Sequence, residues 1–172
     1  MMNKTTRDVE AGCDNPGDHP WIGVVSDTHG LMRREALDAL AGSALILHAG
    51  DIGKPSVLEE LREMAPVVAI RGNVDRGVWA NSLPEHEWVD FQGIIMHMLH
   101  DIAGLSIASV ATSARVVISG HSHQPSIAER DGILFLNPGS AGPRRFSLPV
   151  TIARLWVVEE VINAGLIYLR VS

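Results

Sequence analysis

The sequence predicts an α/β protein, a two-sheet α/β sandwich in a single domain with helices on the outer faces. In the first half, apolar segments typical of buried strands alternate with segments of helical periodicity. In the second half, short strand-like segments follow one another between turns rich in Gly, Pro and Asn. The chain has 172 residues, 46% of them hydrophobic, which is enough for one domain with its own core.

The first half predicts three strands joined by two helices. The segment WIGVVS is a continuous apolar run, as expected for a strand buried on both faces. A β-α-β-α-β order implies right-handed crossovers, so we expect parallel neighbouring strands covered by helices. The predicted strands are residues 21–26, 44–48 and 66–70, and the predicted helices are residues 31–42 and 54–65.

The second half predicts a different arrangement. Residues 86–99 read as two strands around Gly93, and residues 107–114 as a short helix. The remaining short segments indicate an antiparallel or mixed sheet, because turns separate them at close intervals. These further strands are expected at residues 115–119, 125–130, 132–137, 150–158 and 164–171.

Composition narrows the classes of function. The formal net charge of -6 argues against a general nucleic-acid surface, which needs clustered Lys and Arg. Cys13 is the only cysteine, so no internal disulfide and no cysteine-based zinc cluster can form. No apolar stretch is long enough for a membrane span or a secretory signal. We therefore expect a cytoplasmic protein without membrane association, with residues 1–20 as a disordered leader and residues 21–172 as the domain.

Five of the predicted strands end in side chains that can bind metal ions. In an open α/β sheet, the carboxyl ends of the strands meet at one edge, where ligands bind. Residues far apart in the sequence can therefore converge there. In chain order, these strand endings carry Asp27 and His29, then Asp51, then Asn73 and Asp75, then His100, and finally His121 and His123.

The residue types suit a pair of divalent cations. In extended backbone, side chains at i and i+2 lie on the same side, so Asp27 with His29, and His121 with His123, could each act as a pincer toward one ion. Asp51 is the candidate bridge, because a carboxylate can bind two cations through its two oxygens. Asn73 would add a neutral amide oxygen.

Each signal alone has a simpler explanation. The segment SDTHG is more often an ordinary strand-to-turn junction, and GD or GN are common turn dipeptides. His97 and His100 could be hydrogen-bonded histidines of a half-buried strand. Five such endings in a fixed order are much harder to explain as turns.

The ordered motifs DTH, GD, GNVD, HD and GHSH closely resemble those of the calcineurin-like metallophosphoesterase superfamily, and NPGS at residues 137–140 resembles its small YfcE-type branch. The resemblance covers residues 21 to 158. It implies one metal ion held by Asp27, His29, Asp51 and His123, and a second held by Asp51, Asn73, His100 and His121.

The same resemblance implies a mechanism and a cofactor. Two divalent ions are expected, manganese first, with nickel, iron or zinc as alternatives. A water or hydroxide between the ions would attack phosphorus in line, with His29, Asp51 and Asn73 as catalytic residues. The substrate would be a small phosphoester.

Two departures from the family pattern bear on this expectation. Most members have a histidine after the asparagine, which helps to stabilise the transition state or to protonate the leaving group, whereas this chain has Val74. The YfcE-type branch commonly has a residue other than histidine there, and the resemblance to it implies a phosphodiesterase with weak monoesterase activity. The family pattern HG is HD here, so Asp101 is either a partner that orients a ligand histidine or a solvated turn residue.

Other roles stay open. His97 is the alternative ligand to His100, and Arg144 or Arg145 could touch substrate phosphate or lie on the surface. The rival function is a protein-binding scaffold, as in the metallophosphoesterase-like subunit of the retromer coat, which has an impaired site. Complete ligand positions favour an enzyme. A homo-oligomer would be unsurprising, because the second half predicts exposed apolar strands.

Overall fold

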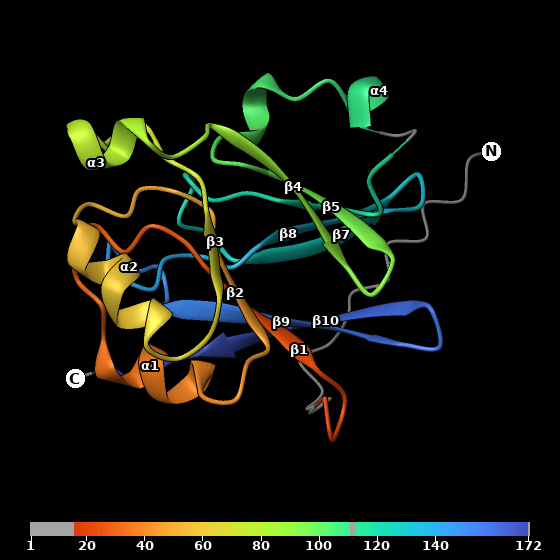
Figure 1. Cartoon of the computed structure of the whole chain (residues 1–172), viewed down its shortest axis with the longest axis horizontal. Coiled ribbons are helices and arrows are strands. Elements are labelled where there is room, and N and C mark those ends of the chain that lie inside the picture. Colours follow the sequence, from red (N-terminus) through yellow and green to blue (C-terminus); the bar gives the residue numbers. More distant parts are fainter. Residues whose placement is uncertain (1–15, 111–112, 172) are drawn as a thin grey trace.

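The computed structural model describes residues 16–110 and 113–171, which form two mixed five-stranded sheets packed face to face (Figure 1). The strand order is β10-β9-β1-β2-β3 in the first sheet and β4-β5-β6-β8-β7 in the second. The predicted two-sheet sandwich is confirmed. The strands are β1 (Trp21–Val25), β2 (Leu45–His48), β3 (Val67–Ala69), β4 (His86–Phe91), β5 (Ile94–Leu99), β6 (Val116–Ile118), β7 (Ser126–Arg130), β8 (Ile133–Asn137), β9 (Thr151–Val158) and β10 (Val161–Tyr168).

The first sheet contains the predicted parallel core of β1, β2 and β3. The sequence grouped the last two strands with the other short strands of the second half, but in the structure they extend the first sheet. β9 pairs antiparallel with the free edge of β1, in register Trp21 with Trp156, and β10 pairs with β9. Six of the eight residues of β9 are buried, so this strand suits a central position with apolar cover on both faces.

The second sheet is mixed, which was one of the two arrangements, antiparallel or mixed, that the sequence predicted. Its central strands β5, β6 and β8 are parallel, and the hairpins β4–β5 and β7–β8 flank them. Both hairpins turn through a non-glycine residue and a glycine with positive φ, namely Gln92 with Gly93 and Asp131 with Gly132. Two such residues suit the type I′ turns that fit the twist of a hairpin.

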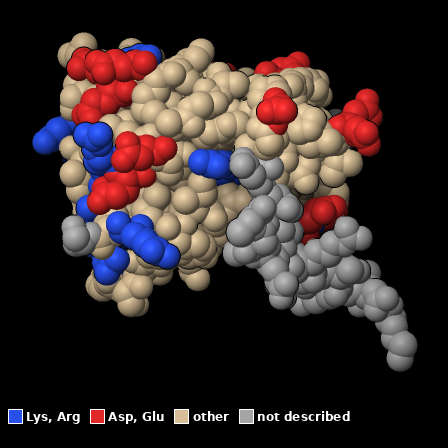
Figure 2. All heavy atoms as spheres, turned by 90° about the horizontal axis from the view of Figure 1, so that it is seen from below, with Lys and Arg blue, Asp and Glu red and all other residues tan. Residues whose placement is uncertain are grey.

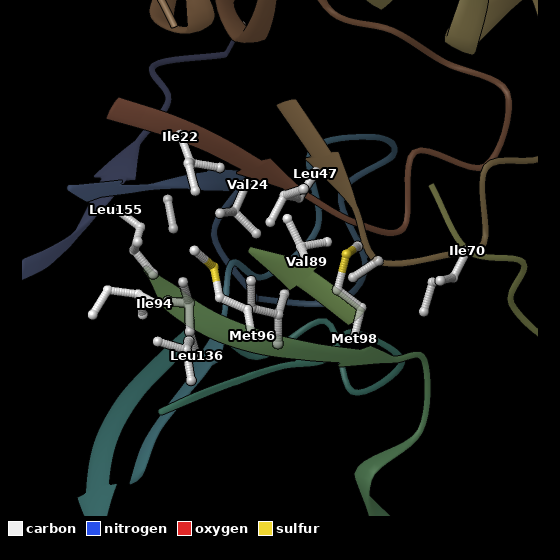
Figure 3. Packing of buried hydrophobic residues seen from close by; sticks show 14 of the residues in the cluster. Ile22, Val24, Leu47, Ile70, Val89, Ile94, Met96, Met98, Leu136 and Leu155 are labelled. Atoms are coloured by element: carbon white, nitrogen blue, oxygen red, sulfur yellow. The ribbon is translucent and has the colours of Figure 1, made fainter. Parts of the chain in front are cut away.

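The main core lies between the two sheets (Figure 3). Ile22, Val24 and Leu47 of the first sheet point toward Met96 and Met98 of the second. All five side chains are fully buried. Alternate residues of each strand fill this layer, so the strand ends are held rigidly where the two sheets meet.

The predicted helices cover the outer faces of the sheets (Figure 1). α1 (Arg34–Leu40) and α2 (Pro55–Arg62) bury Leu40 and Leu61 against the outer face of the first sheet. α1 begins three residues later than predicted, because the Leu31 amide donates to the Thr28 carbonyl in a turn. The outer face of the second sheet packs against the segment with η1 (Ile102–Gly104) and α4 (Ile107–Val110). A further helix, α3 (Val78–Asn81), lies between β3 and β4 and was not among the predicted helices.

Two expectations concern regions that the structure covers only in part. Residues 1–15 of the predicted leader lie outside the described residues, so its disorder stays a prediction. Within the described part of the chain, no helix has both the length and the apolar character that a membrane crossing requires. Figure 2 shows acidic and basic side chains intermixed on the face seen from below, rather than one continuous basic field.

Candidate metal centre

The carboxyl ends of five strands meet at one edge of the sandwich. Backbone hydrogen bonds tie their loops together: the Asp27 amide donates to the Gly50 carbonyl at 3.0 Å, and the Gly120 amide to the His100 carbonyl at 3.0 Å. The convergence predicted from the strand endings therefore occurs. The side chains brought together are Asp27 and His29 after β1, Asp51 after β2, Asn73 after β3, His100 after β5, and His121 and His123 after β6.

One group of potential ligands consists of Asp27, His29 and His123. The Nε2 atom of His123 lies 3.2 Å from Asp27 Oδ1 and 3.1 Å from His29 Nε2. The His29 Nε2 atom lies 3.8 Å from the same carboxylate oxygen. Asp27 is fully buried and His123 is 4% exposed, so this group is largely shielded from bulk water.

The second group consists of Asp51, His100 and His121, with Asn73 beside it. The His100 Nε2 atom lies 3.2 Å from Asp51 Oδ2, and His121 Nδ1 lies 3.1 Å from Asn73 Oδ1. Asp51 also connects the two groups, because its Oδ2 atom lies 4.0 Å from His29 Nε2. This is the position expected of the predicted bridging carboxylate.

The hydrogen bonds around His100 fix which of its nitrogens faces the carboxylates. His100 Nδ1 lies 2.7 Å from the Ala49 carbonyl, which can only accept, so Nδ1 carries the proton. In the neutral ring, Nε2 then directs its lone pair toward Asp51, and Asp27 Oδ1 lies 4.0 Å away. A lone pair facing two carboxylates is unfavourable unless a cation or a proton lies between them, and a backbone carbonyl on the far nitrogen is the usual support of a metal-binding histidine.

Unsatisfied polar atoms also mark this region. Among the described residues, Asp27 Oδ1 and His100 Nε2, which face the potential ligands, are buried without a hydrogen-bond partner. Buried polar groups are normally paired, so each such atom calls for an explanation. Carboxylate oxygen and imidazole nitrogen are common donors to divalent ions, and the donor set therefore fits a metal site.

Burial and charge shift the pKa values in this region in different directions. Burial raises the pKa of Asp27 to about 6, and burial lowers the pKa of His123 to about 4. Burial alone would lower the pKa of His100, but Asp51, the Ala49 carbonyl and Asp27 outweigh it and raise that pKa. The buried carboxylate and the buried neutral imidazole are both groups that a bound cation would stabilise.

The local backbone differs from the extended pincers that the sequence suggested. Asp27, His29, His121 and His123 have φ values of 55°, 46°, 67° and 59°, in the left-handed region. Asp27 and His29 do join the same group, but His121 and His123 belong to different groups. The pincer interpretation was therefore wrong for His121 and His123. All four residues lie in loops rather than in extended strands, so the alternation of side chains in a strand does not decide which of them meet.

The sequence matches the family model of the calcineurin-like phosphoesterase superfamily domain over residues 21–160. The chain belongs to this superfamily. The resemblance drawn from the motifs is thereby confirmed, and the convergent strand ends are those of a calcineurin-like phosphoesterase fold.

Relatives by sequence carry related names. The chain is 34% identical over 158 residues to a probable metallophosphoesterase of Methanothermobacter thermautotrophicus, covering 85% of this chain and 91% of that protein. It is 28% identical over 137 residues to a protein named phosphodiesterase MJ0936 of Methanocaldococcus jannaschii, covering 69% of this chain and 82% of that protein.

Solved structures share the fold. A predicted phosphoesterase of Streptococcus pneumoniae superposes with a TM-score of 0.68 at 25% identity, covering 87% of this chain and 89% of that chain. The E. coli phosphoesterase YfcE superposes with a TM-score of 0.61 at 21% identity, covering 87% of this chain and 100% of that chain. Vps29 of Entamoeba histolytica, solved in complex with zinc, superposes with a TM-score of 0.68 at 20% identity, covering 86% of this chain and 98% of that chain.

Asp101 and His97, whose roles the sequence left open, do not join either group of potential ligands. His97 lies within β5 with its ring stacked on Trp88, at a centroid distance of 4.4 Å, so its side chain packs on the sheet rather than at the strand ends. Asp101 accepts a hydrogen bond from the Ala103 amide at 2.9 Å and caps η1. Its other oxygen lies 3.9 Å from His121 Nε2, so it is mainly a turn residue beside a potential ligand.

Asp75 supports the loops of the site. Its carboxylate accepts hydrogen bonds from the amides of Ile52, Gly53 and Gly72 at 3.1, 2.8 and 2.8 Å. These amides belong to the loops after β2 and β3, which carry Asp51 and Asn73. Asp75 therefore joins two loops, and this uses both of its oxygens.

His48 is a supporting residue that sequence reasoning missed. Thr28 Oγ1 donates its single proton to the Ile52 carbonyl, so it accepts from His48 Nε2 at 2.9 Å. His48 Nδ1 accepts from the Gly50 amide at 3.2 Å. The ring is fully buried and neutral, and burial lowers its pKa to about 3. Its position at the end of a buried strand was the only available sequence signal.

A cavity of about 260 Å³ opens beside the second group of ligands. Arg71 and Glu85 form an ion pair of 2.8 Å in its wall. Such a space next to the potential metal ligands can accommodate part of a substrate. Its lining residues are Arg71, Gly72, Asn73, Glu85, His86, Leu99, His100 and Asp101.

Proposed function

We propose that this calcineurin-like phosphoesterase is a metal-dependent phosphodiesterase. The observation that carries the proposal is the convergence of two groups of carboxylate and imidazole donors, with buried atoms that have no hydrogen-bond partner. Superfamily membership makes hydrolysis of a phosphoester the reaction class that fits such a site.

The proposed centre takes two divalent ions. One would be held by Asp27, His29, Asp51 and His123, and the other by Asp51, Asn73, His100 and His121. The distances that link these side chains support the division, with Asp51 between the two groups. Manganese is the proposed metal. Nickel, iron and zinc are the alternatives, because the mixed nitrogen and oxygen donors suit all four.

The chain's own residues prepare this chemistry. When bound, the ions supply Lewis acidity that activates water and offsets charge on the phosphoryl oxygens. Asp51 is oriented by the Val74 amide, which donates to its Oδ1 atom at 3.0 Å. Asp27 is oriented by the His121 amide, which donates to its Oδ2 atom at 3.1 Å. Each carboxylate thus keeps its other oxygen directed at the histidines.

The preference for diesters is inferred from the residue that comes directly after Asn73. Val74 is 41% exposed, and its apolar side chain can donate no proton to a leaving group. Poor leaving groups depend most on such a donor. The cavity of about 260 Å³ beside Asn73 and His100 gives space for the second ester group of a diester. We therefore expect diesters with good leaving groups to be the better substrates.

A protein-binding scaffold is the second candidate. The similarity to Vps29 at 20% identity supports a shared fold but no shared role. A scaffold needs no metal chemistry, and this chain keeps all seven proposed ligand side chains close together. The enzyme therefore stands as the favoured function. A cytoplasmic location and a homo-oligomer stay predictions that accompany it.

The test compares two substrates in protein stripped with a chelator. Bis-p-nitrophenyl phosphate and p-nitrophenyl phosphate are hydrolysed with and without added manganese, with His123→Ala as the control. We expect manganese-dependent cleavage of the diester, weak cleavage of the monoester, and loss of both in the variant. Metal-loaded, folded protein that cleaves neither ester would contradict the enzyme and favour the scaffold. Equal rates on both esters would contradict only the diester preference.

A further inference from the structure

Arg145 is a cationic side chain placed directly at the edge of the proposed metal centre. Its Nη2 atom lies 3.4 Å from Nε2 of His29, across 116 residues of sequence. Its positive charge contributes to lowering the pKa of His29 and of His123, after the larger effect of burial. Arg145 therefore faces the group formed by Asp27, His29 and His123.

The loop that carries Arg145 is fastened to the loop that carries Asp27. The Ala141 amide donates to the Ser26 carbonyl at 3.0 Å, and Ser140 Oγ donates to the Asp27 carbonyl at 2.8 Å. Gly142 lies so close to the Thr28 backbone that a Cβ atom would collide with the Thr28 carbonyl. The two loops are thus in direct contact just before Arg145.

Two further interactions define the course of the chain around Arg145. On one side, Arg33 Nε donates to the Gly142 carbonyl at 2.9 Å. On the other, the Leu148 amide donates to the Arg145 carbonyl at 3.0 Å, and Phe146 has a left-handed φ of 52°. The hydrogen bond closes a turn that begins at Arg145.

The charge of Arg145 is not balanced by an acidic partner. By contrast, Arg71, which lines the cavity beside Asn73 and His100, is paired with Glu85 at 2.8 Å. Within the described ranges, 16–110 and 113–171, Arg145 makes no ion pair, and its nearest polar contact is an imidazole. A cation held beside a metal centre without a carboxylate is available for an anion that binds there.

We propose that Arg145 binds the phosphoryl oxygens of the substrate and so stabilises the charge of the transition state, a role for which this chain has no histidine at position 74. Guanidinium presents two parallel N–H groups to phosphate and holds its proton at all physiological pH values. Arg145 would therefore stabilise charge without protonating the leaving group. This inference rests on the proposed phosphodiesterase function, and it makes Arg145 a residue that touches substrate.

The test uses two neighbouring substitutions, Arg145→Gln and Arg144→Gln. Both residues are exposed, so neither change removes a buried contact, and Arg144 serves as the matched control. Isothermal titration of manganese-loaded protein with inorganic phosphate measures anion binding, and titration of stripped protein with manganese measures metal binding. Hydrolysis of bis-p-nitrophenyl phosphate is the third measurement.

We expect Arg145→Gln to weaken phosphate binding by at least about tenfold, the size of one charge-assisted hydrogen bond. The ratio kcat/KM should fall by a similar factor, while manganese binding is retained or tightened because a nearby positive charge is gone. Arg144→Gln should stay within about twofold of wild type for all three quantities.

Separate outcomes test the inference and the function on which it rests. Phosphate affinity unchanged in Arg145→Gln, or lowered equally in both variants, overturns the role of Arg145, whether or not the wild type is active. A second outcome separates the two proposals. If the wild type cleaves no ester, and phosphate binding is weakened in Arg145→Gln but not in Arg144→Gln, the anion site holds and the phosphodiesterase proposal fails.

Discussion

The carboxylate of Asp75 offers a way to perturb the support of the metal centre without removing a proposed ligand. It is 7% exposed and accepts three backbone hydrogen bonds, from Ile52, Gly53 and Gly72. Replacement by asparagine keeps the shape of the side chain but leaves one acceptor oxygen. Asp75→Asn therefore weakens the link between the loops that carry Asp51 and Asn73.

The expected cost follows from the three hydrogen bonds. In its better orientation, the new amide oxygen keeps the bonds from Ile52 and Gly72, and the new NH₂ group faces the Gly53 amide. Losing one bond to a charged acceptor costs about 1.5 to 3 kcal/mol, and the two retained bonds lose about 1 kcal/mol each on becoming neutral. The sum, roughly 3.5 to 5 kcal/mol, is a large part of the stability of a typical domain.

Equilibrium unfolding in guanidinium chloride, with chelator present, measures this cost apart from metal binding. Asp90→Asn is the matched control, because Asp90 is exposed and accepts one bond, from the Gly93 amide at 2.9 Å in the β4–β5 turn. We expect the control to lose under about 1 kcal/mol. An Asp75→Asn protein no less stable than the Asp90→Asn protein would refute the assignment of Asp75 as the link between the two loops.

Other features of the molecule give three further predictions. Burial lowers the pKa of His48 from 6.5 to about 3, so the unfolded state binds the extra proton in that window and stability falls as pH falls. Between about pH 6 and pH 4, the free energy of unfolding of the chelator-treated wild type should therefore fall by about 1.4 kcal/mol per pH unit relative to that of His48→Gln, as measured by unfolding titrations. The same pH dependence in both proteins would contradict this. Manganese at a hundredfold excess over its Kd should stabilise the wild type by about 2.7 kcal/mol in thermal melts, whereas an equal gain in His123→Ala would exclude His123 as a ligand. Gly72→Ala places a Cβ against the Asp51 backbone and carboxylate, so urea unfolding should show a loss of at least about 2 kcal/mol. Gly104→Ala meets open space and should change stability by under about 0.5 kcal/mol, and similar losses in both variants would argue against the close approach.

The convergence of the site was predictable because it depends on topology. Parallel strands run in the same direction, so the residues after β1, β2 and β3 must lie at one edge of the sheet whatever their loops do. The apolar runs identified these strands, and their polar endings identified candidate ligands. The prediction therefore extended to Asp27, Asp51 and Asn73 without any knowledge of loop conformation.

Contacts between loops that are distant in the sequence could not be predicted from sequence patterns. Arg145 meets His29 only because the loop after Asn137 lies on the loop after β1, and no periodicity encodes such a contact. The pairing of β9 with β1 escaped prediction for a related reason. Apolar residues on both faces of a strand predict that both faces of its sheet are covered, but they do not say which strands it pairs with.

The backbone conformation of the proposed ligands explains why the expectation of extended strands was wrong at these residues. Asp27, His29, Asp51, His121 and His123 all have φ between 46° and 67°, a region that costs an ordinary side chain about 1 to 2 kcal/mol. Backbone hydrogen bonds between neighbouring loops hold this conformation, since the Asp27 amide donates to Gly50 and the His29 amide to Asp51. The strain turns side chains of successive loops toward one point, which extended strands could not do. Because the sandwich core fixes the strand ends, we expect folding to set the positions of the proposed ligands before a cation binds.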